Sequence, residues 1–182
     1  MRSLRPLLHV LAALLLIAAS SGCGYSLAGR GSFLPANIRV IGVPLFTNNT
    51  NVFELERRIT EKVRGELSGR GKYRVEPTTA GADAILSGVI SSVTFTPTAW
   101  NAANQATRYV LALTASVELR AAGEGGKVIW TNPSLQFRDE YEVTSTTFAS
   151  DAAAFLGSDV NAQERLATEF ARTVISAMLE AF

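Results

Sequence analysis

The chain has 182 residues and a formal net charge of +1, with 47% hydrophobic residues, which is enough to build the core of one domain. A charge this close to zero argues against general nucleic-acid binding. The sequence holds one cysteine and one histidine, Cys23 and His9, so it excludes an internal disulfide and argues against His-based catalytic triads and the usual His/Cys zinc sites.

The N-terminal segment has the order of parts found in a secretory signal. Arg2 and Arg5 supply positive charge, residues 6–19 form an uncharged apolar run, and small residues lead to Cys23. The apolar run is shorter than the roughly 20 residues that a helix needs to cross a bilayer. We therefore expect residues 1–22 to be removed as a signal peptide, which would change the net charge to −1.

A signal that ends directly at a cysteine resembles the lipobox of bacterial lipoproteins, in which that cysteine receives a diacylglyceryl group. The alternative is an ordinary signal peptide with a cysteine near its cleavage site. Cys23 has no second cysteine to pair with, which favours lipidation. Two or more acyl chains hold a protein stably on a membrane. Gly24, in place of the Asp that retains Gram-negative lipoproteins at the inner membrane, implies sorting to the outer membrane by the same resemblance.

The first half of the mature chain predicts a tether, a strand and a helix. Residues 23–37 contain Gly and Ser without periodicity and are expected to be a lipidated tether, followed by a single domain over residues 38–182. Arg39 to Phe46 is typical of a buried strand. Asn51 with Glu54 predicts a capped helix start, and Gly69 to Gly71 predicts its end. The apolar stripe of this helix is Val52, Leu55, Ile59, Val63 and Leu67.

The second half predicts mainly strands. Tyr73 to Glu76 is a short strand, and two long alternating strands follow at Ile85 to Phe95 and Tyr109 to Arg120. Further strands are expected at Lys127 to Thr131 and Leu135 to Val143. Ser158 or Asp159 is expected to cap a final helix. Its apolar stripe is Leu166, Phe170, Val174, Ile175, Met178 and Leu179.

This order of elements predicts an α+β fold. Two amphipathic helices have no partner for their apolar stripes except one face of the sheet. We expect a two-layer sandwich with a mixed, mostly antiparallel β-sheet of about four to five strands and both helices packed on one face.

Several segments, in the right order and spread over essentially the whole mature chain, resemble the lipopolysaccharide-assembly lipoprotein family LptE. They are Cys23-Gly24-Tyr25-Ser26-Leu27, Leu34-Pro35-Ala36-Asn37-Ile38, Ala82-Asp83-Ala84-Ile85-Leu86-Ser87-Gly88, Arg108-Tyr109-Val110-Leu111, Val128-Ile129-Trp130 and the terminal helix. The resemblance implies a non-catalytic protein without a cofactor or metal. It implies a lipid-anchored domain of the outer membrane that faces the periplasm, seated in the lumen of the β-barrel LptD, which it helps to assemble for lipopolysaccharide transport.

The loop between the two long strands carries the candidate contacts. In the family, basic residues around this loop are proposed to touch lipopolysaccharide, but Trp100 to Gln105 contain no Lys or Arg here. Arg108 is the nearest cation and is the candidate lipopolysaccharide contact. Trp100 is the candidate partner contact, because aromatic residues are enriched at interfaces. The polar loops Thr47–Asn51 and Thr96–Thr107 have two interpretations: they contact a partner, or they are ordinary surface loops.

Two charged groups allow more than one interpretation. Seven basic residues lie between Arg57 and Arg74, and such a cluster could attract lipid A phosphates. The alternative, which we favour, is a solvated helix face on which basic residues pair with carboxylates, as in Glu54–Arg58 and Lys62–Glu66. Among the acidic residues near Asp139, Glu140 and Glu142 share one strand face, so we expect them to be solvated or paired across the strand.

Two other functions remain alternatives. Arg39 to Gly88 also resembles the N-terminal half of secretion lipoproteins of the curli-pore type, which oligomerise into rings. A lipid-anchored hydrolase of cell-wall polymer would need a convergent pair of carboxylates in a cleft.

Overall fold

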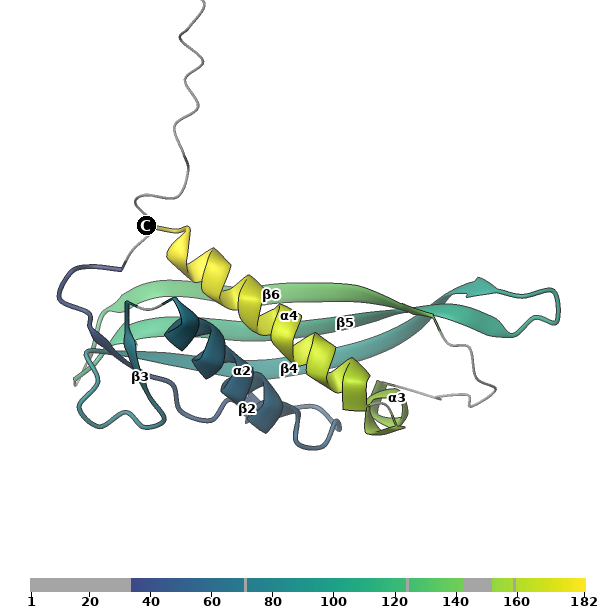
Figure 1. The fold of residues 1–182 in the computed structure, drawn as a ribbon, viewed down its shortest axis with the longest axis horizontal. Helices are drawn as coiled ribbons and strands as arrows, with labels where there is room; N and C mark the ends of the chain where they lie inside the picture. The colour runs from purple at the N-terminus through teal and green to yellow at the C-terminus, as the bar shows by residue number, and fades with distance from the viewer. Residues whose placement is uncertain (1–33, 71, 124, 143–151, 159) are drawn as a thin grey trace, which may run out of the picture. The chain divides into compact units, whose positions relative to one another are not determined.

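The computed structural model describes residues 34–182 except 71, 124, 143–151 and 159 (Figure 1). The predicted signal peptide, Cys23 and most of the predicted tether lie outside the described residues. Val143 and Asp159, named above at the end of a strand and the start of a helix, also lie outside them.

The described residues form a mixed six-stranded sheet in the order β3-β1-β4-β5-β6, with β2 paired beside β4. The strands β1, β2 and β3 run parallel to their neighbours, and β4, β5 and β6 form an antiparallel meander. The strand bounds are β1 Val40–Gly42, β2 Thr47–Asn48, β3 Arg74–Glu76, β4 Ala84–Trp100, β5 Ala106–Ala121 and β6 Val128–Glu142.

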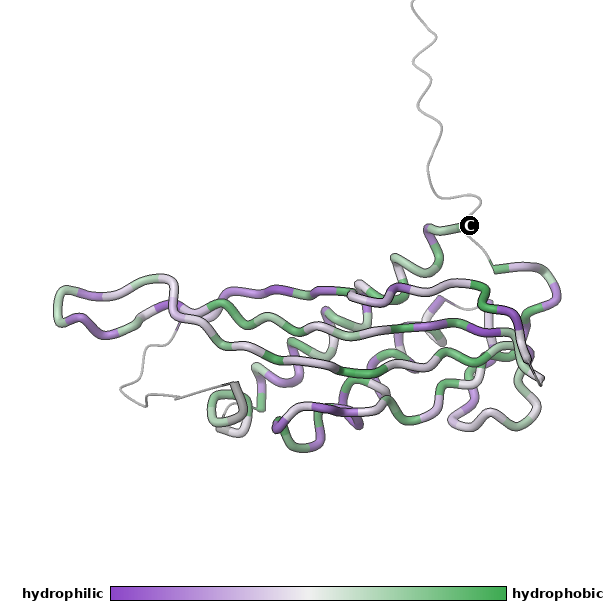
Figure 2. Tube along the Cα trace, turned by 180° about the vertical axis from the view of Figure 1, so that it is seen from behind, coloured by the Kyte–Doolittle hydropathy of each residue, from purple (hydrophilic) through white to green (hydrophobic). Residues whose placement is uncertain are grey.

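The helices α2 (Leu55–Gly69) and α4 (Val160–Leu179) pack side by side on one face of this sheet, with the short α3 (Ala152–Ser158) before α4. The other face, which we call the open face, is covered by no described element (Figure 2). The predicted α+β two-layer sandwich is confirmed. The structure adds the two-residue β2 and α3, which the sequence did not predict.

One layer of apolar side chains between the sheet and the helices forms the core. Alternate residues of β5 from Tyr109 to Leu119 are buried, as the alternation predicted. The predicted stripes of both helices are also buried; Val52 is buried too, but it precedes α2. Trp130 on β6 is half-buried against this core.

A β-bulge at Ser91 divides β4 into two parts. Ile90 pairs with Ala115 and Ser92 with Thr114, so Ser91 has no partner residue in the register. Its hydroxyl donates to the carbonyl oxygen of Thr114 at 3.0 Å. An extra residue reverses the alternation of a strand. Leu86 and Ile90 therefore face the helices before the bulge and Val93 and Phe95 after it, so the single alternation predicted through Ile85–Phe95 is wrong.

The strand predicted over Arg39–Phe46 is broken after Gly42, because the backbone beyond it bonds to α2. The guanidinium of Arg64 donates from Nε and Nη2 to the carbonyl oxygen of Val43 at 2.9 and 2.7 Å. The Phe46 amide donates to the buried Thr60 Oγ1 at 3.0 Å, and Thr60 in turn donates to the carbonyl oxygen of Glu56. Pro44 lies between Val43 and Phe46 and has no backbone N–H to donate to a neighbouring strand.

Two further predicted boundaries differ in the structure. The segments Lys127–Thr131 and Leu135–Val143 belong to one strand, β6, whose register shifts around Pro133. Because β6 has β5 as its only strand neighbour in the described sheet, the missing proline amide is tolerated there. The loop expected at Trp100–Gln105 is shorter by one residue, since β4 continues through Trp100.

Candidate partner-binding site

The described residues contain no group of three or more His, Cys, Asp or Glu side chains placed to hold a metal ion. None of the helices in this part of the chain combines the length and apolar character needed to cross a bilayer. What stands out on the described surface is a set of exposed large apolar side chains, headed by Phe53 at 83% exposure, Leu45 and Val160 at 58% and Trp100 at 55%.

Trp100 lies at the end of the hairpin formed by β4 and β5, which extends beyond the helices (Figure 1). The tip is fixed by Asn101, whose Oδ1 accepts from the amides of Ala103 and Gln105, each at 3.0 Å. Asn104 completes the turn with a φ of 58°. The sequence from Ala84 to Thr107 holds no charged residue, so the tip presents an aromatic ring among uncharged polar groups.

An aromatic stack braces this hairpin where it leaves the helix layer. The ring of Phe95 on β4 stacks between Tyr109 of β5, at 4.1 Å between ring centroids, and Phe155 of α3, at 4.3 Å. Phe155 also packs edge-to-face with Tyr141 on β6, with 5.3 Å between the ring centroids, and the guanidinium of Arg165 on α4 lies over the Tyr141 ring. Such pairs each contribute about 0.5–1.5 kcal/mol beyond their buried area. The stack thus joins three strands to both C-terminal helices and stiffens the base of the hairpin.

Arg108, the candidate lipopolysaccharide contact, lies on the open face at the start of the braced hairpin. Its Nη2 donates to Glu142 Oε1 at 2.8 Å, and its Nε lies 3.9 Å from Glu140 Oε2. The hydrogen bond and charge of Glu142, with the charge of Glu140, raise the pKa of Arg108 above its ordinary value. Of the two outcomes expected for Glu140 and Glu142, the structure shows pairing across the strand. Asp139 points to the other face and pairs with Arg165 at 3.0 Å.

The basic residues of α2 are largely engaged with neighbouring carboxylates or carbonyl oxygens. Arg57 pairs with Glu54 at 3.0 Å and Glu61 at 3.3 Å, and Lys62 pairs with Glu164 on α4. The favoured interpretation as a solvated, paired helix face is therefore correct. The specific pairs Glu54–Arg58 and Lys62–Glu66 are wrong, because Glu54 reaches Arg57 and α4 brings a closer carboxylate to Lys62.

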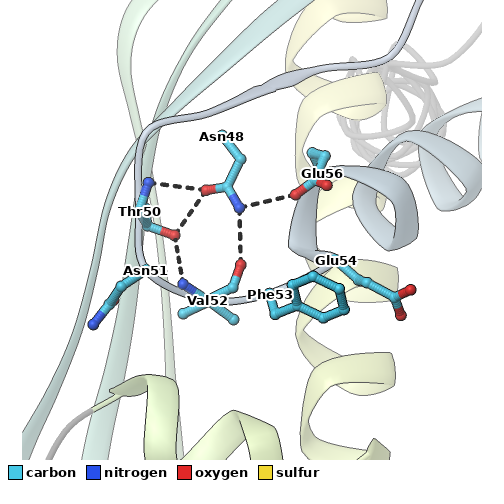
Figure 3. Close-up of a pocket in the computed structure, with 7 residues that line it drawn as sticks. All are labelled: Asn48, Thr50, Asn51, Val52, Phe53, Glu54 and Glu56. Carbon is cyan, nitrogen blue, oxygen red and sulfur yellow. Dashed lines mark hydrogen bonds between the residues drawn. The ribbon is translucent and has the colours of Figure 1, made fainter.

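The loop between β2 and α2 lines a shallow pocket of about 380 Å³ and is organised by Asn48 (Figure 3). Asn48 Oδ1 accepts from the amide and hydroxyl of Thr50 at 3.0 and 2.7 Å. Its Nδ2 donates to the carbonyl oxygen of Val52 at 2.8 Å and to Glu56 Oε2 at 2.9 Å. The predicted Asn51–Glu54 cap is wrong: Glu54 occupies the cap position at φ 60° without a side-chain cap bond.

Phe53 lies on this loop with its ring in solvent. Burying a phenylalanine is worth about 1.5–3 kcal/mol relative to leaving it exposed, and the Phe53 ring contributes none of this to the fold. The left-handed backbone at Glu54 costs about 1–2 kcal/mol. The sequence analysis did not single out Phe53. The sequence feature that indicates its exposure is its position outside the apolar stripe that includes Val52, Leu55 and Ile59, all of which are buried.

The segment from Asp83 to Gly88 performs a structural role. Asp83 Oδ2 accepts from the amides of Arg39 and Val40, both at 2.8 Å, at the start of β1. These two hydrogen bonds lower the pKa of Asp83 below its ordinary value. Gly88 lies against the ring of Phe46, where any side chain would overlap it. The segment therefore holds the start of β1, and Phe46 just before β2, against the first residues of β4.

Asp83 is expected to make stability depend on pH in the acid range. A carboxyl whose pKa is lower in the folded protein stabilises the fold above its unfolded value of 3.8, and this contribution is lost as the pH falls through the folded value. Asp83→Asn should lower the free energy of unfolding at pH 7 and flatten its fall below pH 4, as measured by urea unfolding at several pH values. Asp83→Glu, which keeps the charge, should retain part of the acid dependence. An unchanged acid slope in Asp83→Asn would contradict the assignment.

Comparison with known proteins identifies a family and a fold. A family model described as LptE, lipopolysaccharide-assembly, matches residues 38–178. No curated protein matches the sequence.

Among solved structures, the PelC dodecamer from Paraburkholderia phytofirmans matches with a TM-score of 0.52 and 14% identity over 81% of this chain and 93% of that chain. The hypothetical protein CT253 from Chlamydia trachomatis gives 0.51 and 11% over 80% and 97%. The rare lipoprotein B from Shewanella oneidensis gives 0.45 and 13% over 77% and 96%. The first two likenesses, at such low identity, establish the fold alone.

Proposed function

The chain belongs to the LptE lipopolysaccharide-assembly family, and on that basis we propose that it is an outer-membrane lipoprotein, anchored through acyl chains on Cys23, that binds and plugs the LptD β-barrel. In this role it supports transport of lipopolysaccharide to the outer leaflet and carries out no catalysis itself. The observation that carries the proposal is the family match over residues 38–178. In the proposed arrangement residues 1–22 are the removed signal, residues 23–37 the tether, and residues 38–182 the domain that faces the periplasm and the barrel lumen.

The surface of the described domain supports the plug role physically. The lumen of a wide outer-membrane barrel is polar and hydrated, so a domain that occupies it should keep its apolar layer internal and expose polar or charge-paired groups. Here the helix stripes are buried against the sheet, and the basic residues Arg57, Lys62 and Arg70 each face a carboxylate. The uncharged hairpin tip with Trp100 provides a rigid element for contact with the barrel wall.

The proposal is tested by isolating the intact lipoprotein from native outer membranes and identifying what accompanies it. We expect LptD to co-purify, and depletion of the lipoprotein to reduce lipopolysaccharide at the cell surface. Recovery without LptD, together with a normal outer leaflet after depletion, would overturn the proposal.

We further propose Arg108 as a lipopolysaccharide contact, through exchange of its exposed partners Glu140 and Glu142 for a phosphate. Arg108→Ala should weaken lipopolysaccharide binding by the purified complex about two- to fivefold, the range for an exposed charge pair, whereas Arg108→Lys should retain most of it. Arg138 lies on β6 and projects from the open face, as Arg108 does from β5, so Arg138→Ala is the matched control. Equal loss in the Arg108→Ala and Arg138→Ala variants would count against a specific contact.

A further inference from the structure

We propose that Asp139 and Arg165 form an intramolecular cap that keeps the edge strand β6 from pairing with β6 of a second copy of this chain. The strand β6 has β5 as its only strand neighbour in the described sheet, so its other side is an edge (Figure 1). Such an edge is a template for pairing with another strand unless the fold closes it. Association of two copies is distinct from the proposed binding to LptD, so failure of either proposal leaves the other testable.

The C-terminal half of β6 is the part that could accept a strand. The register between β5 and β6 is regular from Leu135 to Glu142, and it shifts between Asn132 and Leu135, around Pro133. A proline has no backbone N–H and protects an edge against strand addition. The part of the edge around Pro133 is therefore already interrupted, whereas residues 135–142 form a regular edge that needs another form of protection.

The cap occupies the backbone groups in the middle of this regular segment. The Glu140 amide donates to Asp139 Oδ1 at 2.9 Å, and the Glu140 carbonyl oxygen accepts from Arg165 Nη2 at 3.2 Å. Arg165 Nε lies 3.0 Å from Asp139 Oδ2, so the two capping side chains are joined to each other. The guanidinium is also held over the Tyr141 ring, 4.1 Å from its centroid. An incoming strand would have to break both bonds of Glu140, and hydrogen bonds to charged groups are stronger than those between neutral groups.

A second copy of β6 is the strand that this edge would accept without the cap. We consider an antiparallel β6–β6 pair whose two-fold axis passes between the two Asp139 residues. Arg138 then lies opposite Glu140 of the second copy, in both directions, and the freed backbone groups of Glu140 bond to that strand. Phe137 lies opposite Tyr141 on the other face. Opposite charges and aromatic pairs across two strands each stabilise a sheet.

The same register shows a second way in which Asp139 opposes pairing. The two Asp139 carboxylates would lie directly opposite each other, and like charges in that position destabilise a sheet. Asp139 therefore acts through the hydrogen bond to Glu140 and through its own charge. The complementarity of the neighbouring residues explains why this position needs both.

Removal of the cap tests the proposal. Asp139→Ala/Arg165→Met removes both capping groups, while the methionine keeps an apolar side chain beside Tyr141. The full chain is purified in detergent, and its mass is measured by sedimentation equilibrium over a range of concentrations. We expect the concentration at which half of the chain is dimeric to fall at least about tenfold, because pairing no longer breaks charged hydrogen bonds. Glu169→Ala/Arg172→Met, at an exposed ion pair of α4, is the matched control and should leave this concentration unchanged.

Two results would overturn the inference. One is a cap-free chain that keeps its circular dichroism spectrum and stays as monomeric as the control. The other is an unsubstituted chain that already pairs through β6 as readily as the cap-free chain does. If the double variant does not fold, Asp139→Ala alone, which retains Arg165 over the Tyr141 ring, gives the same test with the same expected direction.

A cysteine at the two-fold axis tests the register of the pair. Cys23 is the only native cysteine, so Asp139→Cys/Arg165→Met in a Cys23→Ser background has a single thiol. Two copies paired as proposed bring these thiols together, and mild oxidation should give a disulfide-linked dimer. The control places the thiol at Gln136 of the cap-free chain, where the opposite residue is Glu142, and should give no such dimer. Equal crosslinking from both positions, or none from position 139 while the cap-free chain dimerises, would refute pairing through β6.

Discussion

Gly88→Val is expected to destabilise the domain by about 3 kcal/mol or more, a large part of the stability of a domain of this size. A Cβ at Gly88 would overlap the ring of Phe46, which is only 2% exposed. The ring has little freedom to move, because the Phe46 amide is bonded to Thr60 on α2. Relief would therefore require the β1–β2 segment to separate from β4. Urea unfolding followed by circular dichroism measures the loss.

A second glycine provides the control for the Gly88 variant. Gly65 lies on α2 with nothing within 4 Å of a Cβ added to it. Gly65→Ala should leave stability unchanged or raise it by up to about 1 kcal/mol, because alanine favours a helix more than glycine does. The double variant Gly88→Ala/Phe46→Leu should be more stable than Gly88→Ala alone. If Gly88→Val and Gly65→Ala unfolded at the same denaturant concentration, the proposed overlap would be refuted.

Cys23→Ser is expected to move the protein from the membrane fraction to the soluble fraction. Each buried methylene of an acyl chain contributes about 0.8 kcal/mol to membrane binding, so loss of two or more chains removes the proposed anchor. Fractionation of cells followed by intact-mass measurement of the mature protein checks both the location and the modification.

A change at the next residue separates anchoring from sorting. Gly24→Asp should leave the acyl chains in place and retain the protein at the inner membrane. An unmodified thiol at Cys23 in the unsubstituted protein would exclude the lipid anchor, whatever the family membership.

The parts of the fold that could be predicted are those in which one periodicity dominates. The alternation of β5 from Tyr109 to Leu119 and the stripe of α4 from Leu166 to Leu179 each place apolar residues on one side only. Burying those residues requires a sheet with helices on one face, and this consequence is confirmed. Local sequence was sufficient because each of these elements is long and amphipathic.

The parts that could not be predicted depend on contacts between distant residues. Arg64 ends β1 by bonding to Val43, which lies 21 residues away in the chain. In β4, Ile85 and Val89 are as apolar as Leu86 and Ile90, so the sequence pattern does not indicate which set is buried or that Ser91 bulges. At the candidate site, pairing across the strand was one of two outcomes expected for Glu140 and Glu142. The loop that carries Phe53 is held by hydrogen bonds of Asn48 that the sequence does not reveal.

The bulge at Ser91 limits how this protein can change in length. Deleting that one residue would join Ile90 directly to Ser92, whose partners Ala115 and Thr114 are already adjacent on β5, so Phe95 would stay against Tyr109 and Phe155. Adding a second unbulged residue between Ile90 and Phe95 would instead send Phe95 to the open face. A deletion or insertion of two residues per strand beyond the bulge would shorten or lengthen the hairpin and leave every side chain on its present face. The reach of the hairpin can therefore evolve in even steps, and an odd step keeps the faces only where it removes a bulge or creates one.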